Sequence, residues 1–214
     1  MKPIFISGIG TGIGKTVIAS IITEAMKADY WKPVQAGEAG TDSALVASVI
    51  SNSETVIHPE TYLLKLAASP HIAAQRENKQ IELKKIADDM SRIHAKHPLV
   101  IEGAGGLMVP LNEKEFVIDL VKMLNVRLVL VSRNYLGSIN HSLMAAAICR
   151  QHGLDVAGWV FNDQYMNYEQ EIVQWSGYPA LFSVPLMNPL SKETILKAAE
   201  SIPPVGMGYL YESL

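Results

Sequence analysis

The sequence is poor in the features that mark secreted, membrane and nucleic-acid-binding proteins. It holds a single cysteine, Cys149, so no disulfide can form within the chain, and its apolar-faced segment predicts a buried, unreactive thiol. The formal net charge of −3 provides no basic excess for nucleic acid. No stretch approaches the roughly 20 apolar residues of a membrane-spanning helix, and no signal-peptide layout opens the chain. We therefore expect a cytoplasmic protein whose partners include neither nucleic acid nor membrane.

What the sequence does contain is an alternation of short apolar runs with helix-period segments. Apolar runs predict strands at 3–8, 30–37, 97–106, 127–133, 155–163 and 180–185. Apolar residues three and four positions apart predict helices at 14–29, 41–51, 115–125 and 138–153, and near 165–175 and 191–201. The stretch 53–81 is less regular and is expected to carry a long loop. The pattern is typical of an α/β fold with a mostly parallel sheet flanked by helices on both faces, and we expect one domain over residues 1–214.

A glycine-rich stretch, GIGTGIGKT at residues 8–16, joins the first predicted strand to the first predicted helix. The dinucleotide pattern G-x-G-x-x-G fails there, because Ile13 or Lys15 stands where the third glycine is needed. The phosphate-loop pattern fits at its end, GKT, although Gly8 comes one residue too early. Backbone N–H groups of such a loop bind phosphate oxygens, Lys15 reaches the outer phosphates, and the Thr16 hydroxyl can ligate Mg²⁺. The loop therefore predicts a bound nucleoside triphosphate.

Polar residues follow two further predicted strands. Lys32 precedes a Pro-Val turn, where it is either an ordinary surface lysine or a residue of the phosphate site. For Asp42, at the start of a predicted helix, two interpretations stay open, a helix-capping residue and a metal ligand. Glu102 closes an apolar strand, where burial is costly without a cation, and the glycines of EGAGG allow a ligand close to the backbone. Glu102 is therefore the candidate carboxylate on the Mg²⁺ side of the site.

Six motifs, taken together, resemble those of the dethiobiotin synthetase family: GIGTGIGKT, KPVQAG, SPHIAA, EGAGGLMVPL, LGSINH and GWVFND. The resemblance implies a P-loop NTPase-like fold and an ATP- and Mg²⁺-dependent ligase of biotin synthesis. Its small-molecule substrates would be 7,8-diaminononanoate, CO₂ and ATP. The reaction would form a carbamate and then a carbamic–phosphoric anhydride, and would close to dethiobiotin. The resemblance also implies a homodimer with active sites near the subunit interface.

The resemblance assigns roles residue by residue. Lys15, Lys32 and Thr11 match catalytic positions, and Thr16, Asp42 and Glu102 match the Mg²⁺ positions. Nucleotide-binding positions are Gly12, Ile13, Gly14, Lys15, Thr16, Val17 and Glu102, with Asn162 and Pro185 at the adenine. Substrate-binding positions are Lys32, Ala36, Gly105, Leu136, Gly137 and Asn140, and the loop 136–140 would come from the partner subunit.

The chain departs from the family pattern at a few positions. Family members often carry an aspartate where this chain has Gly10, and a serine or threonine where it has Ala36. The second change removes a hydroxyl from the substrate side. The alignment at Asp42 can also slip by one residue onto Ser43. None of these departures touches Lys15, Lys32 or Glu102.

An alternative function is an ATPase switch of the partition and septum-site kind, which shares the fold and acts through a protein partner or a membrane. Such switches carry a second lysine five residues before the GKT lysine, at the position of Gly10 here. They also tend to close the later strand with aspartate, where this chain has Glu102. A synthetase that hydrolyses ATP only with its diamine is distinguishable from such a switch by assay.

Overall fold

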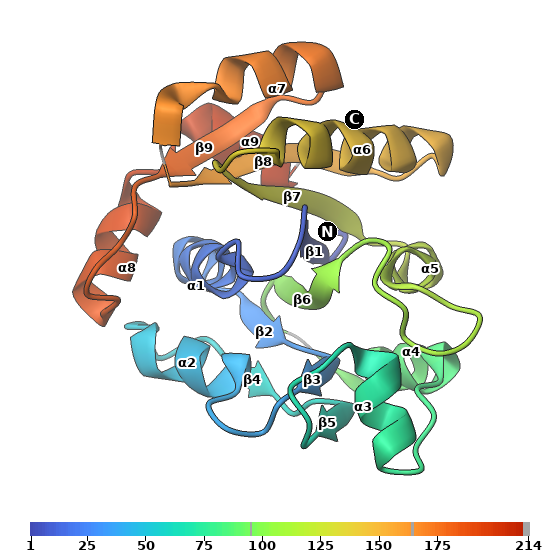
Figure 1. Cartoon of the computed structure of the whole chain (residues 1–214). Helices are drawn as coiled ribbons and strands as arrows, with labels where there is room; N and C mark the ends of the chain where they lie inside the picture. Colours follow the sequence, from blue (N-terminus) through green and yellow to red (C-terminus); the bar gives the residue numbers. More distant parts are fainter. Residues whose placement is uncertain (95, 164, 212–214) are drawn as a thin grey trace.

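A seven-stranded sheet runs through the molecule (Figure 1). The structure, a computed structural model, describes residues 1–94, 96–163 and 165–211. The strand order is β4-β2-β6-β1-β7-β8-β9, and each neighbouring pair is parallel within the described residues. The strands are β1 Ile4–Gly8, β2 Asp29–Trp31, β4 Ile57–His58, β6 Leu99–Gly106, β7 Arg127–Arg133, β8 Val156–Asn162 and β9 Ala180–Val184. The predicted parallel α/β sheet is confirmed.

Helices cover both faces of this sheet (Figure 1). One layer holds α1 Lys15–Met26, α2 Asp42–Val49, α8 Lys192–Glu200 and α9 Pro204–Tyr211. The other holds α4 Leu83–Arg92, α5 Val117–Leu124, α6 Ser138–Gln151 and α7 Glu169–Ser176. A short 3₁₀ turn, Tyr165–Asn167, precedes α7. Across the described residues, none of these helices combines the length and apolar character needed to cross a bilayer.

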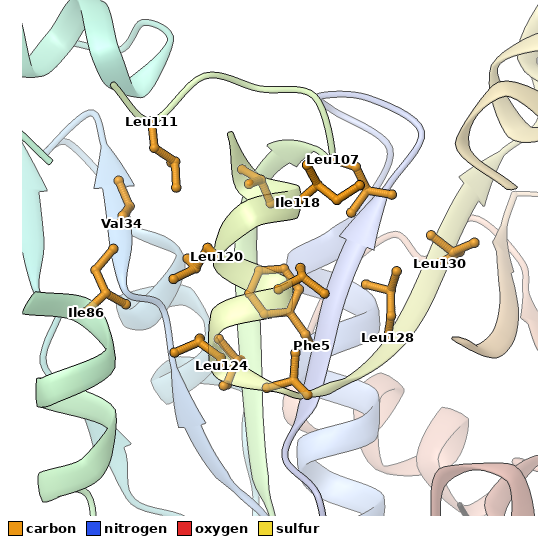
Figure 2. Close-up of a cluster of buried hydrophobic side chains, with 14 of the residues drawn as sticks. Phe5, Val34, Ile86, Leu107, Leu111, Ile118, Leu120, Leu124, Leu128 and Leu130 are labelled. Carbon is orange, nitrogen blue, oxygen red and sulfur yellow. The ribbon is translucent and has the colours of Figure 1, made fainter. Parts of the chain in front are cut away.

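Alternation along the strands explains why both faces are buried. On β1, Ile6 packs with the α1 layer, whereas Phe5 packs with the α5 layer. On β7, Val129 and Leu130 divide in the same way. Figure 2 shows the α5-side cluster, in which Phe5, Leu128 and Leu130 of the sheet meet apolar residues of α4 and α5. Because both faces are covered, the central strands carry continuous apolar runs, and this is why they were predictable from sequence.

The predicted strand 30–37 is wrong as a single element. β2 ends at Trp31, and Val34–Ala36 forms β3, which pairs in parallel with β5 Tyr62–Leu64 in a separate two-stranded sheet. The break falls at Lys32 and Pro33, and the Pro33 carbonyl accepts the first hydrogen bond from β5, 2.9 Å from the Tyr62 nitrogen. Proline cannot donate to a ladder, so it suits a point where the chain changes sheets. Lys32 is thereby left at the carboxyl end of β2.

The expected long loop at 53–81 is also wrong in part, because it contains β4, β5 and α3 Pro70–Arg76. Besides α3, two further helices, α4 and α9, are absent from the sequence prediction. α4 is missing although Leu83, Ile86 and Met90 have helical spacing. α9 is hidden by its glycines, and Gly206 is needed because a Cβ there would lie 2.3 Å from the Leu181 carbonyl oxygen of β9. Close helix–strand packing therefore overrides the low helix propensity of glycine.

Candidate active site

The phosphate loop lies between β1 and α1, at the carboxyl edge of the sheet. Gly12 and Gly14 have φ angles of +73° and +89°, a region that favours glycine. A Cβ on Gly14 would lie 1.9 Å from Nδ2 of Asn162. Gly14 begins α1 with no side-chain cap, so the first N–H groups of the helix stay available to an anion. This local geometry requires the glycines and produces a turn whose N–H groups are suited to phosphate.

Lys15 lies folded over that loop. Its side chain is buried, and Nζ donates to the Gly10 carbonyl oxygen at 3.0 Å. Burial lowers the pKa of Lys15, and the positive charge of Lys32 lowers it further, while Glu102 opposes both effects. The influence of one ammonium on the other reflects the fact that both lysines line one cavity.

Three oxygen-bearing side chains meet beside the loop. The Thr16 hydroxyl lies 3.0 Å from Asp42 Oδ1 and 2.9 Å from Glu102 Oε1, and it can donate to either oxygen. A hydroxyl and two carboxylates are hard oxygen donors, and Mg²⁺ is commonly bound by one or two carboxylates together with substrate phosphates. The described residues contain no cluster of three or more His, Cys, Asp or Glu suited to a metal, so substrate phosphates would have to complete the coordination here. The residues present therefore fit Mg²⁺.

Lys32 joins the two carboxylates. Its Nζ lies 2.5 Å from Asp42 Oδ2 and 3.1 Å from Glu102 Oε1, and its side chain is 5% exposed. Burial alone would lower the pKa of Lys32, but the charges of Glu102 and Asp42 outweigh burial, and the pKa is raised. Lys32 is therefore a buried cation at the end of β2 and not a surface lysine.

The start of α2 shows that Asp42 is not the helix cap. Thr41 is the N-cap, since its hydroxyl oxygen accepts from the Ala44 nitrogen at 3.2 Å. Asp42 is the first helical residue, and its N–H donates to Gln35 Oε1 at 3.3 Å. Its carboxylate is thus free to turn toward Lys32 and Thr16. In this structure Asp42, and not Ser43, has its side chain at the acidic cluster, the group formed by Asp42 and Glu102 around Thr16 and Lys32.

Both carboxylate oxygens of Glu102 have hydrogen-bond partners. It stands on β6 and is buried, and its Oε2 accepts a hydrogen bond of 2.8 Å from the hydroxyl of Tyr30 on β2. Its Oε1 faces Thr16 and Lys32. The buried carboxylate is therefore both charge-compensated and hydrogen-bonded, as burial of a charge requires.

These side chains line one cavity of about 710 Å³. Most of the residues assigned by resemblance lie there: Thr11, Gly12, Gly14, Lys15, Thr16, Val17, Lys32, Ala36, Asp42, Glu102 and Gly105. The two lysines share this cavity, so the chain has room for a small substrate beside the phosphate loop. Such a volume suits a small-molecule ligand.

The remaining assigned residues lie elsewhere. Ile13 is buried in the core, and its carbonyl oxygen accepts from Asn162 Nδ2 at 2.9 Å, which ties the end of β8 to the loop. Pro185 follows β9 directly and is exposed. At the start of α6, Leu136 is 98% exposed and Asn140 donates to the sulfur of Met144 at 3.4 Å. Gly137, the N-cap of α6, and its neighbours Leu136 and Asn140 do not line the cavity with the lysines.

Other cavity residues received no role from the sequence. Gln35 is buried and fixes the start of α2, and a polar residue inside an apolar run was the signal for it. Ser69 and Pro70, at the start of α3, were present in the quoted SPHIAA motif but were given no function. Tyr30 does not line the cavity but contacts Glu102, and it carried no readable signal, because an aromatic residue in a short strand indicates core packing.

Comparison with known proteins agrees with this geometry. A family model described as an AAA domain matches residues 2–194. The ATP-dependent dethiobiotin synthetase BioD of Cytophaga hutchinsonii is 42% identical over 197 residues, which cover 91% of this chain and 94% of that protein. The BioD of Christiangramia forsetii is 44% identical over 173 residues, or 80% of this chain and 81% of that protein.

A solved structure with the same architecture is a ParA family ATPase from Chlorobium tepidum, with a TM-score of 0.61, 14% identity and 98% of each chain covered. At that identity the likeness shows the P-loop ATPase fold alone, so it gives no support to the switch function. The two synthetases, by contrast, are more than 40% identical to this chain, and the matches cover 94% and 81% of their length. The chain therefore belongs to the family of ATP-dependent dethiobiotin synthetases.

Proposed function

We propose that this chain converts 7,8-diaminononanoate, CO₂ and ATP into dethiobiotin, ADP and phosphate, acting as one ligase domain in the cytoplasm. The observation that carries the proposal is the cavity shared by Lys15, Lys32 and the phosphate loop. Membership of the synthetase family supports the same reaction. The seven-stranded sheet contains both β1, near the start of the chain, and β9, near its end, which supports the one-domain assignment.

The first chemical step suits the two lysines. An amine attacks CO₂ only when it is neutral, and it loses a proton as the carbamate forms. Two ammonium groups beside a bound diamine lower its pKa through like charge and stabilise the carbamate anion. Lys15 and Lys32, both lining the cavity, are the residues proposed for this role.

In the second step a carbamate oxygen attacks the γ-phosphorus of ATP, and the bond to ADP breaks. Lys15 and the loop N–H groups would meet the charge on the phosphoryl oxygens, each charge-assisted hydrogen bond contributing about 1.5–3 kcal/mol. Thr16, Asp42 and Glu102 would hold Mg²⁺, which when bound neutralises phosphate charge. Thr11, which belongs to the phosphate loop, lines the cavity and is proposed to contact the reacting groups.

In the last step the second amine attacks the carbonyl carbon of the anhydride, phosphate leaves, and the cyclic urea closes. The anhydride is short-lived, so the amine has to be held about 3–3.5 Å from that carbon. Ala36 and Gly105 line the cavity and are proposed to contact the diamine. Asn162 and Pro185, at the ends of β8 and β9, are proposed to bind adenine.

The substrate carboxylate requires a different surface, and we propose that a homodimer provides it. A hollow of about 330 Å³ lies beside the phosphate loop and is lined by apolar residues of β6, the following turn and α6. Met108 and Met144 in its wall are 50% and 55% exposed. Apolar exposure of this kind suits a second copy of the chain, whose Leu136, Gly137 and Asn140 would meet the carboxylate.

One assay tests the reaction. ADP release is measured with and without 7,8-diaminononanoate and bicarbonate, and the cyclised product is identified by mass. We expect ADP release that depends on the diamine and equals the dethiobiotin formed. ADP release without the diamine, stimulated by a protein partner, would instead support the switch. Light scattering of the purified chain tests the dimer independently.

A further inference from the structure

We propose that Tyr30 is a positioning residue of the active site, whose hydroxyl orients the Glu102 carboxylate for metal binding. The inference rests on the proposed function, because it takes Glu102 as a Mg²⁺ ligand. Neither the quoted motifs nor the cavity lining includes Tyr30. Its role follows from the contacts of Glu102 alone.

The two oxygens of Glu102 have different partners. Oε2 accepts from the Tyr30 hydroxyl at 2.8 Å. Oε1 lies 2.9 Å from the Thr16 hydroxyl and 3.1 Å from Lys32 Nζ. Both Tyr30 and Glu102 are buried, at 0% and 1% exposure, so water does not replace the tyrosine. The tyrosine thus fixes which oxygen of the carboxylate faces the cavity.

Strand register puts the hydroxyl in place. β2 and β6 run parallel, with Tyr30 opposite Val100, two residues before Glu102. Side chains two apart on a strand share a face, and Val100 and Tyr30 both belong to the α1-side core. Tyr30 therefore reaches Glu102 along the sheet from inside the core, where packed residues restrain its ring.

The chemistry of the hydroxyl suits a permanent donor. Burial, together with the negative charge of Glu102, raises the pKa of Tyr30 well above its ordinary value. At neutral pH the hydroxyl therefore carries a proton that it can donate to Glu102 Oε2, the oxygen 2.8 Å away. A carboxylate that lost this donor would have an unpaired buried oxygen and would gain freedom to turn.

Tyr30→Phe tests the inference, since it removes one oxygen and keeps the ring. Mn²⁺ binding in the presence of ADP is measured by electron paramagnetic resonance, which requires no turnover. Loss of a hydrogen bond to a metal ligand typically weakens metal binding about 10–100-fold, and we expect a loss in that range. In steady state, the Mg²⁺ requirement should rise by a similar factor while kcat at saturating Mg²⁺ changes less.

Tyr62→Phe is the matched control. Its hydroxyl accepts from the Glu82 nitrogen at 3.0 Å, in the small sheet, and is also largely buried. Mn²⁺ affinity should stay at the wild-type value. If Tyr30→Phe also binds Mn²⁺ like wild type, the inference is wrong, even where the wild-type chain makes dethiobiotin. If the wild-type chain makes none, the proposed function fails whatever the Mn²⁺ result.

A double variant separates positioning from packing. Glu102→Gln removes the carboxylate to which the Tyr30 hydroxyl donates. Adding Tyr30→Phe to that variant should therefore change Mn²⁺ affinity by less than about twofold. Should Tyr30→Phe lower the melting temperature, the added Glu102→Gln should recover part of the loss. If Tyr30→Phe lowers Mn²⁺ affinity by the same factor in the wild-type chain and in Glu102→Gln, Tyr30 acts through core packing alone, and the proposal is overturned.

Discussion

The two ends of the candidate site differ in how far a single chain completes them. Lys32 after β2, Glu102 in the middle of β6, and Thr16 and Asp42 at the starts of α1 and α2 form a closed network of hydrogen bonds and ion pairs. At the start of α6, Leu136 is almost fully exposed. The proposed phosphate and metal end is thus built into the fold, whereas the proposed carboxylate end has an open surface. Sensitivity to mutation should differ accordingly.

The closed end has a cost that explains its connectivity. Buried charges are tolerated when they are paired, and removing one partner of such a pair is strongly destabilising, by about 3–5 kcal/mol. Lys32 pairs with two carboxylates at once, so it compensates much of their charge. The open end has no such constraint, and exposed substitutions there usually change stability by about 0.5 kcal/mol or less.

Lys32→Met should give the largest effect, because it breaks the closed end at its cation. We expect dethiobiotin formation to fall by at least about 10²–10³-fold, the loss typical of removing one charge-stabilising donor. Binding of a non-hydrolysable ATP analogue, measured by calorimetry, should change much less, since the loop and Lys15 remain.

Lys27→Met is the control for that variant. Lys27 pairs with Glu54 at the surface, away from the cavity, where solvent screens the pair and leaves it little effect on stability. Its activity should stay close to wild type. Near-normal turnover by Lys32→Met would refute the role given to Lys32 and with it the functional distinction between the two ends.

Leu136→Asp should sharpen the comparison from the open side. In the monomer the side chain faces solvent, so the melting temperature should not change at protein concentrations where the wild-type chain is monomeric. Burial of a leucine in an interface is worth about 1.5–3 kcal/mol, which corresponds to about a 10–100-fold weaker dimer. Sedimentation velocity over a range of concentrations measures dimerisation, and the KM for the diamine should rise with it.

Val205→Asp serves as the comparison for Leu136→Asp. Val205 is an exposed residue of α9, so the variant places the same charge on another apolar surface position. It should leave both the dimer and the KM unchanged. If Leu136→Asp dimerises and binds diamine as wild type does, residues 136–140 are not contributed across an interface.

The predictability of the site from sequence follows the same division. The place of Lys15 and Thr16 was predictable, because a glycine loop between a strand and a helix is a local pattern. Glu102 was singled out as an acid that closes a buried strand, and that is wrong in detail, because β6 continues to Gly106. Asp42 needed knowledge of which residue caps α2, and sequence left that open. Tyr30 depends on the register of β2 against β6, strands about 70 residues apart, which no local pattern encodes.

The fold shows a parallel limit. Central strands with both faces buried were predictable from continuous apolar runs. The division of 30–37 into β2 and β3 was not, because the partner of β3 is β5, inside a stretch with only short strands. Pro33 signalled a turn but not a change of sheet. Thus Lys32 was recognised by its motif while the break that positions it was missed.

Thr41→Ala should give the smallest effect and tests whether the closed end depends on the cap of α2. The Thr41 hydroxyl oxygen accepts from the Ala44 nitrogen at 3.2 Å, and loss of such a cap costs about 0.5–2 kcal/mol. For a chain of this size a loss of 1 kcal/mol lowers the melting temperature by about 2–4 °C. Differential scanning calorimetry measures this, with Ser48→Ala on the same helix as control. The Ser48 hydroxyl donates back to the Leu45 carbonyl oxygen, and alanine is the better helix former, so that variant should lose no stability.

The Mg²⁺ requirement of Thr41→Ala distinguishes local from general support. Asp42 is also held by Gln35 and Lys32, so its carboxylate should stay in place without the cap. The Mg²⁺ requirement should therefore rise less than in Tyr30→Phe. A larger rise in the Mg²⁺ requirement than in Tyr30→Phe would mean that the start of α2 determines the geometry of the acidic cluster, and not the register of β2 on β6.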